Sequence, residues 1–234
     1  MEMEEDLREQ GWSMLPNVLS AAEVEHWQAE LEQLRTARNA LAHRESGYGL
    51  RGILRACPEI ARVVGSEAFL GRIGLQASAA WQPVRGILFD KLPGANWKVP
   101  WHQDRTLAVA ERQELPALRG WSRKEGVWHV QAPVSVLERM VTLRLHLDPC
   151  GRDDGPLQVL SRSHRNGILS PLAIQECLAA GSPAVLTAPA GSGLLLRPLL
   201  LHASTCAAAP RRRRILHVEY SADPAPAGLT WACF

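Results

Sequence analysis

Apolar residues recur along the chain with two different periods, a helical period near the N-terminus and a strand-like period further on. Behind Ser20 they return every three, four or seven positions, which predicts an amphipathic helix; these residues are Val24, Trp27, Leu31, Leu34 and Leu41. Ser20 and Glu23 have the spacing of a capping box, in which each side chain bonds to the other residue's backbone N–H. Shorter helices are expected at Pro58–Val64 and Glu67–Arg72.

After residue 75 the pattern changes to short strands punctuated by glycine and proline. Over residues 141–148, Val and three Leu alternate with Thr, Arg, His and Asp, which is the period of a strand. Helices followed by many short strands predict a β-sandwich or small barrel with helices covering one sheet. Further strands are expected at Leu157–Leu160, Ala184–Thr187, Gly193–His202 and Arg213–Ser221.

The composition is that of an ordinary globular domain and excludes several classes of protein. The 234 residues are 46% hydrophobic and 21% charged, which indicates one domain over residues 1–234. A net charge of +2 is too balanced for a nucleic-acid binder, and no apolar run is long enough to cross a membrane. The five cysteines are scattered, which does not favour a disulfide framework. The first residues, Met1 to Asp6, are acidic, which does not favour a secretory signal. We therefore expect a cytoplasmic enzyme or binding domain.

Histidines standing two residues before a carboxylate are the candidate metal ligands, because such residues share one face of a strand. Four such pairs occur, where composition alone would give about one: His43/Glu45, His102/Asp104, His146/Asp148 and His217/Glu219. The first pair lies beside a predicted helix end, and the last has no histidine after it to complete a triad. Two pairs stay open, His102/Asp104 and His146/Asp148, each with His202 as the third ligand.

Four segments form an ordered set that covers most of the chain. They are Glu9–Val24, Phe89–Pro93 with Trp101-His-Gln-Asp104, Asp154–His164 with its Gly-Pro-Leu and Ser-His elements, and Arg197–Ser204 followed by Arg213–Tyr220. In this order they resemble the phytanoyl-CoA dioxygenase family of non-haem iron, 2-oxoglutarate-dependent oxygenases. The resemblance implies a mainly β fold with N-terminal helices, a double-stranded β-helix of the cupin-like jelly-roll kind. Its helical part would span about residues 1–75 and its jelly-roll core about residues 76–222.

The resemblance also implies which pair binds the metal. In the family the His-x-Asp motif precedes the Gly-Pro-Leu segment by a long insertion, and the strand just before that segment carries no ligand. This implies Fe(II) on His102, Asp104 and His202, with His146 and Asp148 as an ordinary strand pair. Three N/O ligands on one face of an octahedral ion leave positions for 2-oxoglutarate and O₂.

The implied reaction converts 2-oxoglutarate to succinate and CO₂ while a small-molecule substrate is hydroxylated or desaturated. Halogenating relatives lack the ligating carboxylate, so the presence of Asp104 favours hydroxylation or desaturation. The alternatives are a non-catalytic metal- or ligand-binding jelly roll and a hydrolytic zinc site. The intact positions His102, Asp104, His202 and Arg213 favour the oxygenase.

The far carboxylate of 2-oxoglutarate needs a buried cation, and a guanidinium binds it through two hydrogen bonds. Alternation along the last strand does not settle the choice among Arg212, Arg213 and Arg214. The family places this arginine about eleven residues after the distal histidine, which implies Arg213. Ser204 and Lys91 match family positions near the same co-substrate.

Residues around the metal segment are the candidates for substrate contacts. These are Trp101, Arg105, His129 and Gln131. The insertion from Arg105 to Gln131 is expected to fold over the opening of the pocket and to select the substrate.

Overall fold

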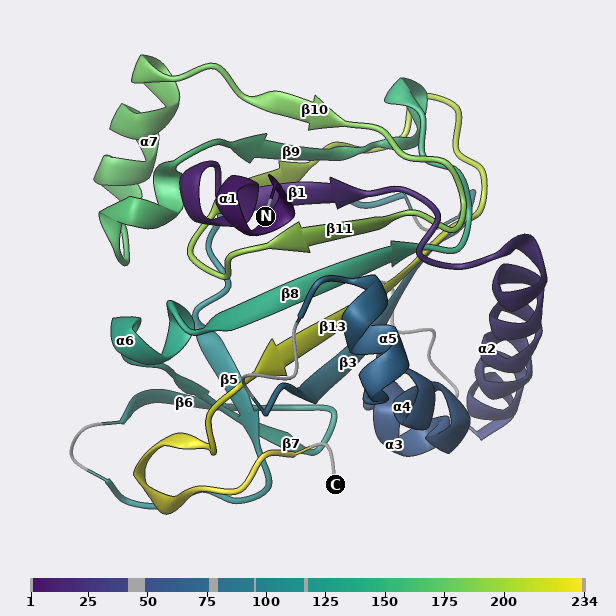
Figure 1. Ribbon diagram of the computed structural model, residues 1–234, viewed down its shortest axis with the longest axis horizontal. Coiled ribbons are helices and arrows are strands. Elements are labelled where there is room, and N and C mark those ends of the chain that lie inside the picture. The colour runs from purple at the N-terminus through teal and green to yellow at the C-terminus, as the bar shows by residue number, and fades with distance from the viewer. Residues whose placement is uncertain (1, 42–48, 76–79, 95, 116–117, 233–234) are drawn as a thin grey trace.

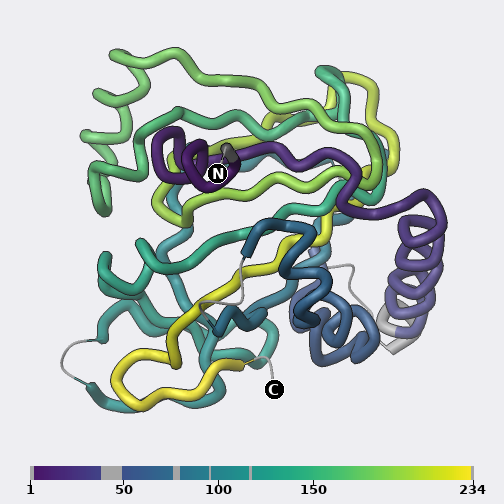
Figure 2. The backbone as a smooth tube through the Cα atoms, viewed as in Figure 1, coloured from purple at the N-terminus to yellow at the C-terminus, as the bar shows by residue number. Residues whose placement is uncertain are grey.

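The protein, in a computed structural model, is described over residues 2–41, 49–75, 80–94, 96–115 and 118–232, and is built on two antiparallel β-sheets (Figure 1). The larger sheet has the strand order β1 (Trp12–Leu15), β11 (Gly193–Leu196), β8 (Met140–His146), β13 (Arg213–Ser221), β3 (Gln82–Lys91) and β2 (Leu50–Arg51). The smaller sheet has the order β10 (Ala184–Leu186), β9 (Leu157–Leu160), β12 (Leu201–Ser204) and β4 (Val99–His102). The predicted jelly-roll fold is confirmed, and segments distant in sequence lie side by side, such as β1 and β11 (Figure 2).

The central strands of the larger sheet have an apolar outer face and a polar inner face. On β8, Val141, Leu143 and Leu145 belong to the main hydrophobic core, while Arg144 points to the opposite side. On β13 the apolar residues again join that core, and alternate residues line the interior of the jelly roll. Alternation therefore marks an outer face covered by helices and an inner face that builds a pocket.

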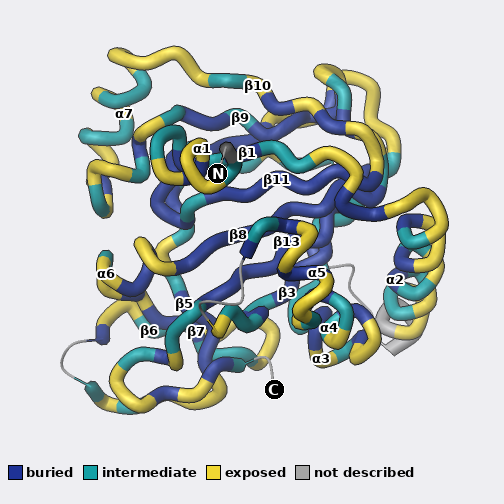
Figure 3. The backbone as a smooth tube through the Cα atoms, viewed as in Figure 1, coloured by how far each residue is buried: buried dark blue, intermediate teal, exposed yellow. Residues whose placement is uncertain are grey.

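Helices cover that apolar outer face (Figures 1 and 3). Trp27 and Leu31 of α2 are almost fully buried in the main core, which is worth roughly 1.5–3 kcal/mol for each such side chain. The predicted capping box is present, with the Ser20 N–H donating to Glu23 and the Glu23 N–H donating to Ser20 Oγ. The helices over this face are α2 (Ala21–Leu41), α3 (Ile53–Ala56), α4 (Pro58–Val64) and α5 (Glu67–Arg72).

The strand predicted at Gly193–His202 is wrong, because this apolar run is two strands in different sheets. β11 pairs with β8, and β12 pairs with β9 and β4. The chain turns between the sheets at Arg197-Pro198, where proline has no N–H to continue a strand ladder. Both halves are buried, so the sequence reads as one continuous apolar strand.

The insertion between Arg105 and Gln131 forms a third, three-stranded sheet that the sequence did not predict. Its order is β5 (Thr106–Val109), β7 (Val127–Gln131) and β6 (Arg119–Lys124). It packs on a separate hydrophobic cluster that includes Leu107 and Val130. The helices outside these sheets are α1 (Glu2–Glu9), α6 (Val134–Leu137) and α7 (Pro171–Ala180). None of the helices in the described ranges has the length and apolar character needed to cross a bilayer.

Candidate metal centre and co-substrate pocket

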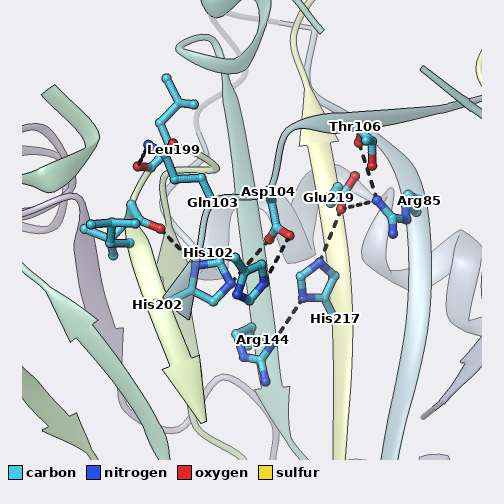
Figure 4. A network of polar contacts seen from close by, with 12 residues as sticks. Arg85, His102, Gln103, Asp104, Thr106, Arg144, Leu199, His202, His217 and Glu219 are labelled. Carbon is cyan, nitrogen blue, oxygen red and sulfur yellow. Dashed lines mark hydrogen bonds and ion pairs between the residues drawn. The ribbon is translucent and has the colours of Figure 1, made fainter. Parts of the chain in front are cut away.

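Three side chains meet where β4 and β12 run side by side (Figure 4). His102 and His202 are direct cross-strand partners, and their ring centroids lie 4.2 Å apart. Asp104 follows just beyond β4, and its backbone N–H donates to Pro198 O at 2.9 Å. One ligand atom from each of the three lies within 4.8 Å of the others, and no other such group exists among the described residues.

Both imidazoles are oriented to present Nε2 to this point. His102 Nδ1 lies 2.8 Å from Pro100 O, and His202 Nδ1 lies 2.9 Å from Leu200 O. Because a carbonyl only accepts, each Nδ1 carries the proton and each Nε2 keeps its lone pair for a metal. The Nε2 atoms lie 3.8 and 3.6 Å from the Asp104 carboxylate oxygens.

The electrostatics also suit a divalent ion. Burial lowers the pKa of His202 to about 4, so this imidazole is neutral at pH 7. Burial opposes ionisation of Asp104, but in acid the nearby histidines are protonated, and the positive charges of His202, His217 and His102 outweigh burial and hold the pKa of Asp104 below its usual range. Two neutral imidazoles and one carboxylate form the donor set of a ferrous site with open positions.

The other predicted pairs do not form such a site. His146 is buried on the inner face of β8, whereas Asp148 lies beyond the end of that strand and accepts two hydrogen bonds from the Arg214 side chain. His217 and Glu219 are buried in an ion network instead. His43/Glu45 lies outside the described residues.

Gln103, between two of the ligands, points away from them and anchors the segment. Its amide nitrogen donates to Leu199 O at 2.7 Å and to Gly167 O at 2.8 Å. Its amide oxygen accepts from the Leu169 N–H at 2.8 Å. These buried bonds tie the metal segment to the corner before β12, and no motif in the sequence signalled them.

Arg213 opens into the same cavity as the three ligands, a space of about 350 Å³. Its side chain is buried, and one Nη donates to the carbonyls of Asp154 and Gly155. Its Nε is also buried and has no partner in the described part of the chain. A buried guanidinium with donors left over is a site for a carboxylate.

The neighbouring arginines are already neutralised, in contrast to Arg213. Arg211 forms two bonds with Asp154, Arg212 two with Asp90, and Arg214 two with Asp148. None of these three lines the cavity.

Comparison with known proteins agrees with this geometry. The sequence profile of the family described as phytanoyl-CoA dioxygenase (PhyH) matches residues 7–215. The chain belongs to the phytanoyl-CoA dioxygenase family. Its predicted membership, its fold and its assignment to the 2-oxoglutarate-dependent oxygenases are thereby confirmed.

Several proteins of known activity or known structure are similar to this chain. L-proline trans-4-hydroxylase of Streptomyces griseoviridis is 24% identical over 246 aligned positions, which cover 90% of this chain and 82% of the relative. EctD from S. alaskensis, solved with 2-oxoglutarate and 5-hydroxyectoine, has a TM-score of 0.71 at 17% identity, covering 93% of this chain and 74% of that one. The carbocyclase SnoK of nogalamycin biosynthesis has a TM-score of 0.69 at 16% identity, covering 94% and 83%.

Two further residues were predicted to lie near 2-oxoglutarate, Ser204 and Lys91. Both are near Arg213, but only Ser204 lines the cavity. Ser204 is on the cavity wall, two residues after His202 on β12. Lys91 is the cross-strand partner of Arg213 and is buried behind the wall, where its Nζ donates to Thr205 O at 2.7 Å. Burial, followed by the charge of Arg213, lowers the pKa of Lys91 to about 8.

The four substrate candidates separate into two groups. Arg105 and Gln131 line the cavity. Trp101 packs on the apolar cluster around Leu201, and His129 lines a smaller pocket beside β3. A substrate contact by any of the four stays a prediction.

A buried ion network on the inner face of the larger sheet was missed by the sequence. Arg85 donates to Glu219 at 2.9 Å, Glu219 lies 3.4 Å from His217 Nε2, and His217 Nδ1 lies 3.2 Å from Arg144 (Figure 4). The sequence does contain a sign of this network, because polar residues occupy every second position of β8 and β13. These positions face the pocket.

Acid is expected to destabilise the fold through His146. Burial, followed by the charge of Arg144, lowers its pKa to about 3, whereas an unfolded histidine has a pKa near 6.5. Between these values the unfolded chain binds more protons, so the free energy of unfolding falls as pH drops below about 6.5. The loss is at most about 1.4 kcal/mol per pH unit.

Urea unfolding at pH 7 and pH 5 in the presence of EDTA measures this effect. His146→Gln should lose less stability between the two pH values than the wild type does, because it carries no titrating group. An identical loss in both proteins would assign the acid sensitivity to other residues.

Proposed function

We propose that this member of the phytanoyl-CoA dioxygenase family is an Fe(II)- and 2-oxoglutarate-dependent dioxygenase that hydroxylates or desaturates a small molecule. The observation that carries the proposal is one cavity shared by His102, Asp104, His202 and the buried Arg213. Bound iron would supply oxidative chemistry that uses O₂ and releases succinate and CO₂ from 2-oxoglutarate. The free cysteines among the described residues favour a reducing compartment such as the cytoplasm.

Each residue has a defined task in this proposal. The two imidazoles and Asp104 hold the metal on one side and leave the cavity side open. Arg213, assisted by Ser204, binds and orients the distal carboxylate of 2-oxoglutarate. Arg213 is itself buried, and its low exposure to water strengthens these charge-assisted bonds.

Succinate release under air, with Fe(II) and 2-oxoglutarate supplied, tests the proposal. L-Proline is a reasonable first substrate because a relative is an L-proline trans-4-hydroxylase. We expect slow succinate formation alone and faster formation with the true substrate, and none without O₂. If fully metal-loaded protein releases no succinate under any condition, the chain is instead a non-catalytic jelly-roll binder.

Asp104 is expected to separate oxygenation from halogenation. Its carboxylate fills the position that a halide would need, so the wild type in chloride should give oxygenated or desaturated product without chlorination. Asp104→Gly should abolish that product, because the variant loses a ligand and a negative charge. Product mass spectrometry in chloride and in chloride-free buffer measures this. A chlorinated product from the wild type would contradict the role given to Asp104.

A further inference from the structure

The cavity carries an unusual balance of charge. Its described lining holds a single carboxylate, Asp104, and six cations: Arg51, Arg85, Arg105, Lys124, Arg144 and Arg213. Asp104 is committed to the metal in the proposed function. The cations therefore need other negative partners.

Carboxylates outside the lining neutralise two of the six. Glu219 lies 2.9 Å from Arg85, and Glu125 lies 2.8 Å from Arg51. Arg213 is assigned to 2-oxoglutarate, whose two negative charges equal the two positive charges of the metal ion. Arg105, Lys124 and Arg144 have no carboxylate partner within the described residues.

Lys124 lies at the end of the cavity remote from Arg213. Arg85 is the cross-strand partner of Glu219, which is six residues after Arg213 on β13, or about 20 Å along the strand. Lys124 lines the same cavity as Arg85 and Arg51, and the next residue, Glu125, forms the 2.8 Å ion pair with Arg51.

We propose that Arg51, Arg85 and Lys124, here called the cationic end, bind an oxyanion of the substrate, a carboxylate or a phosphate. The proposal rests on the proposed function and adds the substrate class: small anions, selected over their neutral analogues. Arg51 and Arg85 each have one carboxylate partner, so the positive charge left over at this end is that of Lys124. An oxyanion compensates this charge, and a neutral group does not. A cavity of about 350 Å³ restricts the substrate to a small molecule.

The strand β6 supplies a matched control for this site. Arg123 precedes Lys124 but lies over the Trp128 ring at 5.4 Å and donates to Gly126 O. It does not line the cavity. Arg123→Gln and Lys124→Gln therefore remove the same charge from neighbouring positions, and only the second removes it from the cationic end.

The experiment measures equilibrium binding to anaerobic protein loaded with Fe(II) and 2-oxoglutarate. The first set of probes consists of small carboxylic acids without a basic amine, each paired with its primary amide, such as N-acetyl-L-proline and N-acetyl-L-prolinamide. The second set consists of phosphate monoesters, each paired with the parent alcohol. We expect the anions of one set, the carboxylates or the phosphate monoesters, to bind at least about tenfold more tightly than their neutral partners. Lys124→Gln should reduce that preference about tenfold, Lys124→Arg should restore it, and Arg123→Gln should leave it unchanged.

The outcomes separate this proposal from the proposed function. Three results would each contradict anion binding at the cationic end. They are equal binding of anions and neutral partners, no binding of any carboxylate or phosphate monoester, and an unchanged preference for anions in Lys124→Gln. Failure of the proposed function appears instead as absent succinate release under air, whatever the probes do. The affinity for 2-oxoglutarate should be the same in Lys124→Gln and the wild type.

Discussion

His102→Ala protein is expected to lose stable Fe(II) binding and all turnover. In the proposed function His102 supplies one of three metal ligands, and its Nε2 is oriented toward Asp104 by the hydrogen bond from Nδ1 to Pro100 O. Loss of a residue that merely orients a metal ligand typically costs about 10- to 100-fold in metal affinity, so loss of a ligand should exceed that range. Metal titration of the apo protein, followed by succinate assay at saturating iron, measures both effects.

His146→Ala is the matched control, because it removes a buried histidine that follows the same His-x-Asp pattern. It should keep its iron affinity, since His146 does not converge with the ligands. If His146→Ala lost the metal while His102→Ala retained it, the choice between the two pairs would be reversed.

Arg213→Ala is expected to raise the dissociation constant for 2-oxoglutarate by roughly 30-fold to several thousand-fold. Removing one partner of a desolvated, charge-assisted pair costs about 2–5 kcal/mol. Arg213 is 5% exposed, and its buried Nε has no partner among the described residues, so water has little access to replace the bonds that the variant loses. Anaerobic titration of metal-loaded protein with 2-oxoglutarate measures the change.

The appropriate control is Arg212→Ala rather than Arg211→Ala. Arg212 is bound to Asp90 on the outer side of the sheet. Arg211 instead holds the side chain of Asp154, whose carbonyl accepts a bond from Arg213, so its loss could disturb the site. Equal weakening in Arg213→Ala and Arg212→Ala would mean that the arginine run acts only as diffuse positive charge.

The sequence predicted local features well because each depended on a short, strong pattern. The helices Pro58–Val64 and Glu67–Arg72 and the strands Leu157–Leu160 and Arg213–Ser221 have the predicted bounds. The metal triad came from a resemblance rather than from spacing, since His146/Asp148 satisfied the same local rule.

The features that were missed depend on the tertiary arrangement. The corner at Arg197-Pro198 is hidden because both flanking segments are buried and apolar. The sheet β5–β7–β6 and its Lys124 could not be placed, since nothing local connects them to Arg85. From the sequence alone, the charged residues of β13 look like a solvent-exposed face of the strand. Only the structure shows that helices cover the apolar face and that the charged face is buried in the interior.

This two-faced construction of β8 and β13 has a consequence for how the protein can evolve. Outward positions such as Leu143 and Val218 fix the fold, whereas inward positions such as Arg144 and His217 line the cavity and belong to its polar network. Burying that many charges is costly, so apolar replacements on the inner face can gain stability while losing activity. Substrate range can therefore diverge at the inward positions of these strands other than Arg213, while the outward residues keep the scaffold unchanged.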